Sequence, residues 1–86
     1  IKVFHVPGHT TGSLCYYFEE DEMVFTGDTL FKQSIGRTDF IYGNHEQLVT
    51  GIRRKLLTLP GQTLVYPGHG ECTTIEEESK HNPFLA

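Results

Sequence analysis

The chain has 86 residues, with 7 Lys and Arg against 11 Asp and Glu, and a formal net charge of −4 at pH 7. This length permits one small domain, and the acidic balance argues against a nucleic-acid-binding surface, which requires clustered Lys and Arg. No apolar stretch approaches the ~20 residues of a membrane span, so we expect neither a nucleic acid nor a membrane as a partner.

Four β-strands are predicted, over residues 1–6, 13–18, 23–26 and 63–66. The acidic turn 19–22 joins the second strand to the third, which indicates a hairpin. Apolar side chains on these strands are expected in the core: Phe4, Leu14, Tyr16, Phe25 and Val65. Residues 29–43 show no periodicity, so we expect a long loop without regular structure, and such loops are often functional.

Two helices are predicted. Asn44 is a suitable N-cap for the first, and apolar side chains then recur at helical spacing, at Leu48, Ile52, Leu56 and Leu59. Pro60 ends this helix. The basic residues 53–55 suit the end of a helix dipole, and we favour a solvated face over phosphate binding there. A capping box at residues 74–77 opens a second helix that ends before residue 82. This order of elements indicates an α/β fold with a sheet and helices in layers.

Three predicted strands end with a glycine followed by a side chain that can bind a metal ion. These side chains are His9, Asp28 and His69. Glycine permits a sharp turn at the rigid end of a strand, so the next side chain can be aimed. Imidazole and carboxylate ligands must converge to within about 2.0–2.2 Å of a zinc ion. One such histidine is more often structural than a ligand, but three such strand ends in one small domain predict a shared metal site.

Four segments, in this order, resemble the metallo-β-lactamase superfamily: 6–13 (VPGHTTGS), 25–31 (FTGDTLF), 36–40 (GRTDF) and 66–70 (YPGHG). The match is nearest to its short glyoxalase II-like hydrolases, of the hydroxyacylglutathione hydrolase type. The resemblance covers essentially the whole chain. It implies the C-terminal half of an αββα sandwich, with about four strands and two helices, so we expect residues 1–86 to form a single partial domain.

The resemblance also implies two metal ions, Zn2+ first, with Fe or Mn as alternatives. His9 would bind one ion, His69 the other, and Asp28 would bridge both as the catalytic carboxylate. A hydroxide shared by the metals would attack the carbonyl of a thioester such as an acylated glutathione. The family's His-x-His-x-Asp-His motif does not occur in the sequence. We therefore expect a missing N-terminal half or a second chain to supply the remaining ligands.

Residues near these ligands have weaker assignments. Thr10 is expected to brace the turn after the first histidine or to hydrogen-bond a ligand. Arg37 and Asp39 belong, by resemblance, to the active-site loop, and an ion pair within that loop is an equally good interpretation. Substrate contact is a further hypothesis for two residues of the same loop, Tyr42 and Lys32.

Two other functions are alternatives. An iron-dependent persulfide dioxygenase shares the GRTDF run, but dioxygenases tend to carry Ala where this sequence has Gly68. The third hypothesis is an inactive half-domain fragment, stable only as a homo-oligomer that pairs through an exposed sheet edge. Cys15 and Cys72 match no zinc-binding spacing, so we interpret them as thiols of a reducing, cytoplasmic compartment.

Overall fold

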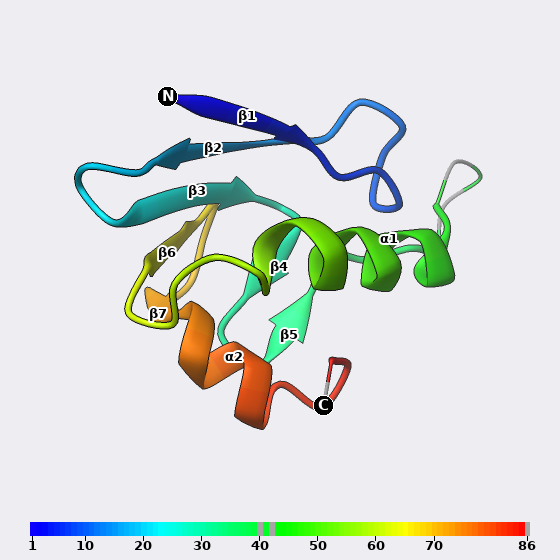
Figure 1. Cartoon of the computed structure of the whole chain (residues 1–86). Coiled ribbons are helices and arrows are strands. Elements are labelled where there is room, and N and C mark those ends of the chain that lie inside the picture. Colours follow the sequence, from blue (N-terminus) through cyan, green and yellow to red (C-terminus); the bar gives the residue numbers. More distant parts are fainter. Residues whose placement is uncertain (40, 42, 86) are drawn as a thin grey trace.

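The computed structural model describes residues 1–39, 41 and 43–85 and has a mixed α/β fold (Figure 1). A five-stranded sheet has the order β1-β2-β3-β6-β7. Its strands are β1 (Lys2–His5), β2 (Leu14–Phe18), β3 (Met23–Gly27), β6 (Leu64–Pro67) and β7 (Thr73–Thr74). The four predicted strands are confirmed to within a residue at each end, and β7 is a short addition.

The parallel pairing of β3 and β6 brings two distant parts of the chain to one edge of the sheet. β1, β2 and β3 are antiparallel neighbours, whereas β6 runs parallel to β3. Gly27 aligns with Pro67 where the two strands end, and Gly68 N–H donates to the Gly27 carbonyl at 2.8 Å. The side chains that follow these strands therefore emerge beside each other.

A small hairpin lies inside the region 29–43, so our expectation of a loop without regular structure is wrong for its first part. β4 (Leu30–Phe31) pairs antiparallel with β5 (Ser34–Ile35). Gln33 in the turn has φ +59°, which glycine would adopt more easily. Two residues per strand are too few to produce a recognisable alternation of polar and apolar side chains.

The helices carry the caps that the sequence predicts. α1 (His45–Gly51) continues into a π-helical turn, η1 (Ile52–Leu56), and the Asn44 side chain accepts from Gln47 N–H at 2.9 Å. The first helix ends at Leu56, before the proline expected to stop it. α2 (Ile75–His81) begins after Thr74, whose hydroxyl accepts from Glu77 N–H at 3.1 Å. Within the described part of the chain, neither helix has the length and apolar character needed to cross a membrane.

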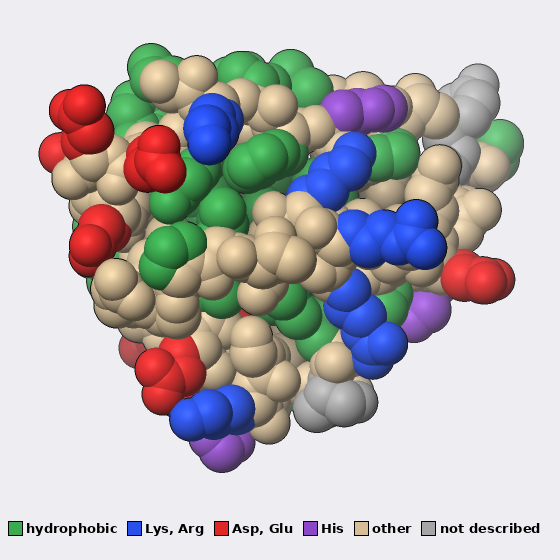
Figure 2. Space-filling view, in the orientation of Figure 1, with side chains coloured by type: hydrophobic (Ala, Val, Ile, Leu, Met, Phe, Trp, Pro, Cys, Tyr) green, Lys and Arg blue, Asp and Glu red, His purple; other side chains and the backbone are tan. Residues whose placement is uncertain are grey.

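Basic side chains gather over the first helix in Figure 2, and acidic ones lie at the opposite end of the molecule, over the β2–β3 turn. Arg53 donates to the Leu85 carbonyl at 2.9 Å, and Lys55 donates to the His5 carbonyl. These bonds fasten the helix to β1 and to the C-terminal segment. Two of the three basic residues thus stabilise packing, and we see no reason to assign them to an anion.

The helices and the β4–β5 hairpin cover one face of the sheet. Among the described residues, twelve apolar side chains form this core, including Val24 and Val65 from the sheet and Leu48, Ile52 and Leu56 from the first helix. On the opposite face the exposed fraction is 53% for Val3, 43% for Leu14, 42% for Tyr16, 41% for Phe25 and 40% for Leu64. The expectation that Leu14, Tyr16 and Phe25 lie in the core is therefore wrong. Val65 is buried as expected, and Phe4 is partly buried against the core.

Candidate metal centre

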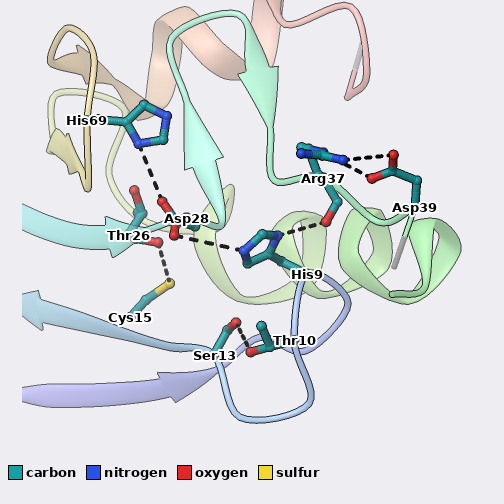
Figure 3. Close-up of polar contacts among 9 residues, drawn as sticks. All are labelled: His9, Thr10, Ser13, Cys15, Thr26, Asp28, Arg37, Asp39 and His69. Carbon is teal, nitrogen blue, oxygen red and sulfur yellow. Dashed lines mark hydrogen bonds and ion pairs between the residues drawn. The ribbon is translucent and has the colours of Figure 1, made fainter. Parts of the chain in front are cut away.

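Asp28 lies between two imidazoles at the edge where β3 and β6 end (Figure 3). Its Oδ2 is 3.8 Å from His9 Nε2, and its Oδ1 is 3.5 Å from His69 Nδ1. Two ligands of one tetrahedral zinc ion, each at about 2.0–2.2 Å from it, are separated by about 3.4 Å. The separations are too long for good hydrogen bonds and fit a cation between each imidazole and the carboxylate oxygen that faces it.

The protonation of His9 suits a metal ligand. Its Nδ1 lies 2.8 Å from the main-chain carbonyl oxygen of Arg37, and a carbonyl only accepts hydrogen bonds. Nδ1 therefore carries a proton, and Nε2 is the ring nitrogen that faces Asp28 (Figure 3). Metal-binding histidines typically use the second ring nitrogen in this way, because the bond fixes both ring orientation and tautomer.

The turn that carries His9 is held against the start of α1. Gly8 has φ +137°, and a Cβ there would lie 2.4 Å from Leu48 Cβ, so only glycine permits this close approach. The Gly8 carbonyl accepts from Asn44 N–H at 2.7 Å. Thr10 Oγ1 lies 2.7 Å from Ser13 Oγ, so this threonine braces the turn, which was one of its two expected roles.

His69 is placed by its neighbours on either side. Its ring lies against Phe31, with ring centroids 4.7 Å apart. A Cβ at Gly68 would lie 3.2 Å from Asp28 Oδ1 and 3.3 Å from the carbonyl group of Gly27. Glycine at this position therefore leaves the space that the Asp28 carboxylate occupies when it faces His69.

A cavity of about 790 Å³ opens beside the three side chains. The β4–β5 turn forms one of its walls, and Lys32 Nζ meets Glu71 Oε2 at 3.2 Å at its rim. Among the described residues, no three His, Cys, Asp or Glu side chains form a group that could hold a metal ion. Asp28 instead forms two half-sites, each with one imidazole. Because a catalytic zinc ion usually needs three protein ligands, the described residues do not complete such a site by themselves.

Other predicted residues lie further from the carboxylate. Arg37 and Asp39 form an exposed ion pair, with Nε–Oδ1 and Nη2–Oδ2 distances of 3.1 and 3.0 Å. The hydrogen bond from Arg37 holds the pKa of Asp39 below its usual value. Arg37 contacts the centre through its carbonyl, which sequence reasoning did not anticipate. The prediction for Tyr42 lies outside the described residues.

Sequence reasoning also missed Phe31. This residue packs on His69 from a two-residue strand. Its place at the end of the segment 25–31 was a signal, but no periodic pattern marks it.

Known proteins match the chain closely. A probable metallo-hydrolase of Streptococcus pyogenes is 52% identical over 83 residues, which are 96% of this chain and 36% of that protein. The hydroxyacylglutathione hydrolase GloC of Haemophilus influenzae is 46% identical over 84 residues, 98% of this chain and 40% of GloC. Among solved structures, the BLEG-1 B3 metallo-beta-lactamase matches with a TM-score of 0.95 and 52% identity, over 99% of this chain and 41% of that chain. TTHA1623, solved in a di-iron-bound form, matches with a TM-score of 0.93 and 44% identity, over 98% of this chain and 42% of that chain.

The chain therefore spans about 40% of the length of the proteins that it matches. The model of the metallo-beta-lactamase superfamily matches residues 1–69. Two of the relatives named above are a probable metallo-hydrolase and a hydroxyacylglutathione hydrolase. The two half-sites around Asp28 fit a divalent metal ion. This chain belongs to the metallo-β-lactamase superfamily, and its fold is part of the fold that defines it.

Proposed function

We propose that this chain is the metal-binding part of a hydrolase of the glyoxalase II-like type, which cleaves thioesters such as an acylated glutathione. The observation that carries the proposal is the position of Asp28, which presents one carboxylate oxygen to His9 and the other to His69. The similarity to GloC supports the substrate class. Zn2+ is the proposed metal, and the di-iron form of TTHA1623 makes iron the alternative to be measured.

Bound divalent ions supply Lewis acidity there and lower the pKa of water to about 7. The residues of this chain hold the ions and shape the pocket. His9, Asp28 and His69 provide the donor atoms, and the Arg37 carbonyl keeps the His9 proton on Nδ1. The β4–β5 turn bounds the cavity in which the substrate would lie.

A complete site requires residues from outside these 86, and we propose an N-terminal half of the same protein as their source. The described residues give each half-site two donors and leave one apolar face of the sheet uncovered. An N-terminal half with its own sheet would supply both the missing ligands and the cover. We also place the protein in the cytoplasm, since both Cys15 and Cys72 are free thiols.

The second candidate is an iron-dependent persulfide dioxygenase, which the similarity to ETHE1 from Myxococcus xanthus favours, with a TM-score of 0.91 and 47% identity over 99% of this chain and 39% of that chain. Gly68 argues against it. Dioxygenases tend to carry Ala at this position, and a methyl group here would crowd Asp28 Oδ1 at 3.2 Å.

Metal analysis and two activity assays on the full-length protein test the proposal. We expect two metal ions per chain and hydrolysis of an acylated glutathione without oxygen consumption. One iron per chain with oxygen consumption would support the dioxygenase instead. A protein that is stable without bound metal and has neither activity would favour the hypothesis of an inactive half-domain.

Asp28→Asn should abolish both metal binding and activity, because an amide binds divalent metals far more weakly than a carboxylate. Asp21→Asn is the matched control, since Asp21 lies exposed in the β2–β3 turn. Equal metal content in the two variants would contradict the role of Asp28.

Gly68→Ala should reduce the metal content from two ions toward one, because its methyl group displaces Asp28 Oδ1 from His69. Gly12→Ala is the control, since a Cβ at Gly12 meets no atom within 4 Å. Metal analysis after gel filtration measures both. Full occupancy in the Gly68 variant would show that the space around Oδ1 is not critical.

A further inference from the structure

Glu78 is a fully buried carboxylate in the middle of α2. Its Oε1 accepts from Gln33 N–H at 2.7 Å and from Asn82 Nδ2 at 2.9 Å, and its Oε2 accepts from Thr73 Oγ1 at 2.6 Å. These three donors are all neutral. A buried carboxylate is costly unless hydrogen bonds compensate it, and apolar residues of similar size often stabilise a core as well or better. Its presence therefore calls for a role other than stability.

The bonds of Glu78 converge on the turn between β4 and β5. Gln33 has φ +59° there, a conformation that costs a residue other than glycine free energy and persists only when surrounding contacts hold it. Asn82, one helical turn after Glu78 and also fully buried, donates to the Ser34 carbonyl at 3.1 Å. Glu78 in α2 and Asn82 at its C-terminal cap thus hold the Gln33 N–H and the Ser34 carbonyl, which belong to consecutive residues of this turn.

The same turn is the wall of the candidate pocket. Phe31, at the end of β4, has its ring 4.7 Å from that of His69, and Lys32 reaches Glu71 across the rim. A displaced turn would shift both side chains. The side chains of Glu78 and Asn82 are therefore coupled to the cavity through their hydrogen bonds with the main chain of this turn.

We propose that Glu78, assisted by Asn82, is a positioning residue that fixes the β4–β5 turn and so sets the shape of the substrate pocket. It acts through Gln33 and Ser34 and contacts neither metal nor substrate. The effect on substrate rests on the proposed function, whereas the effect on the turn does not.

The test compares Glu78→Gln with Glu76→Gln in the full-length protein. The two substitutions are identical and lie on the same helix, but Glu76 is exposed and pairs with Lys80 at 3.1 Å. An amide at position 78 has only one acceptor oxygen for donors that now bind two. We expect hydrogen exchange of the Gln33 amide to accelerate at least tenfold in Glu78→Gln, with the Val65 amide changed less than twofold. The His69 ring protons should shift, and the KM for the thioester should rise about tenfold with kcat within twofold. Glu76→Gln should change none of these quantities.

Two results would overturn the proposal. The first is an unchanged Gln33 amide, and the second is an equal acceleration at Gln33 and Val65, which would make Glu78 a determinant of global stability only. If the wild-type protein does not cleave thioesters, the proposed function fails, and the Gln33 and His69 measurements still decide the role of Glu78. If Glu78→Gln does not fold, Asn82→Ser replaces it. That variant removes the bond to Ser34 and should produce the same local pattern at smaller amplitude, and a uniform pattern would again contradict the proposal.

Discussion

The two faces of the five-stranded sheet have similar apolar character, but only one of them is covered by the rest of the described chain. On the helix-covered face, the exposed fraction is 0% for Cys15, Val24 and Val65. On the open face, Tyr16 and Phe25 are more than 40% exposed. Helices, hairpin and C-terminal segment all pack on the first face, and nothing in the described part of the chain covers the second.

The open face is nevertheless organised. Tyr16 lies opposite Phe25 across β2 and β3. Phe25 stacks on Tyr66 at 5.2 Å between ring centroids and meets Phe18 edge-on at 5.5 Å. Soluble monomers rarely leave so large an apolar patch in water. The difference between the faces shows that only one side of the sheet is the core of this chain, and the other is the side that we propose an N-terminal half covers.

Two adjacent residues of β6 give the strongest test of this difference. Val65→Asp places an unpaired charge in the core and should lower the free energy of unfolding of the 86-residue chain by more than about 4 kcal/mol. Leu64→Asp, on the open face, should cost less than about 1 kcal/mol in the same chain. Urea denaturation followed by circular dichroism measures both, and equal losses would show that the faces are equivalent.

Phe25→Glu should separate the isolated chain from the full-length protein. In the full-length protein we expect a loss of about 3–4 kcal/mol, because the charge enters the interface between sheets. In the isolated chain the cost should be within about 0.5 kcal/mol, and self-association seen by sedimentation should decrease. Phe84→Glu is the control, since Phe84 is 45% exposed and lies outside the sheet. Similar behaviour of the two variants in the full-length protein would contradict a specific interface.

The smallest expected effect is the pH dependence that Cys15 gives to the free energy of unfolding. Burial raises the pKa of its thiol from 9.0 to about 11, and the nearby Thr29 side chain lowers it by less. The folded state therefore holds the proton more tightly, so this contribution to stability is complete below pH 9 and is lost as the pH rises through 11. The loss should be on the order of 2–3 kcal/mol, measured as the difference between the wild-type protein and Cys15→Ala from pH 8 to 11. Cys72→Ala, at an exposed thiol, should retain the full wild-type dependence; a flat difference for Cys15→Ala would contradict the shifted pKa.

Local sequence signals predicted the elements well. The caps at Asn44 and Thr74 lie where short-range side-chain chemistry predicts them, and the buried Leu48, Ile52 and Leu56 follow helical spacing. These features depend on neighbours along the chain, so one sequence suffices to recognise them.

The side of the sheet that is covered depends on contacts distant in sequence, and there the prediction failed. Leu14 and Phe25 are as apolar as core residues, whereas Cys15 and Thr26, which point inward, are less so. When both faces of a sheet are apolar, the hydrophobicity of single residues does not show which face packs on the helices of this chain. The three candidate ligands could be selected from their glycine-bounded strand ends, but the carbonyl that orients His9 and the ring that packs on His69 arise only from tertiary structure.

The parallel pairing of β3 with β6 has a consequence for how proteins of this kind can diverge. The β4–β5 hairpin, which forms one wall of the pocket, and the first helix both lie in the segment between these two strands. The hydrogen bond between Gly68 and Gly27 closes the base of that segment. Insertions or exchanges within residues 32–36 can therefore remodel what enters the cavity, while the pairing of the two strand ends keeps Asp28 beside His69.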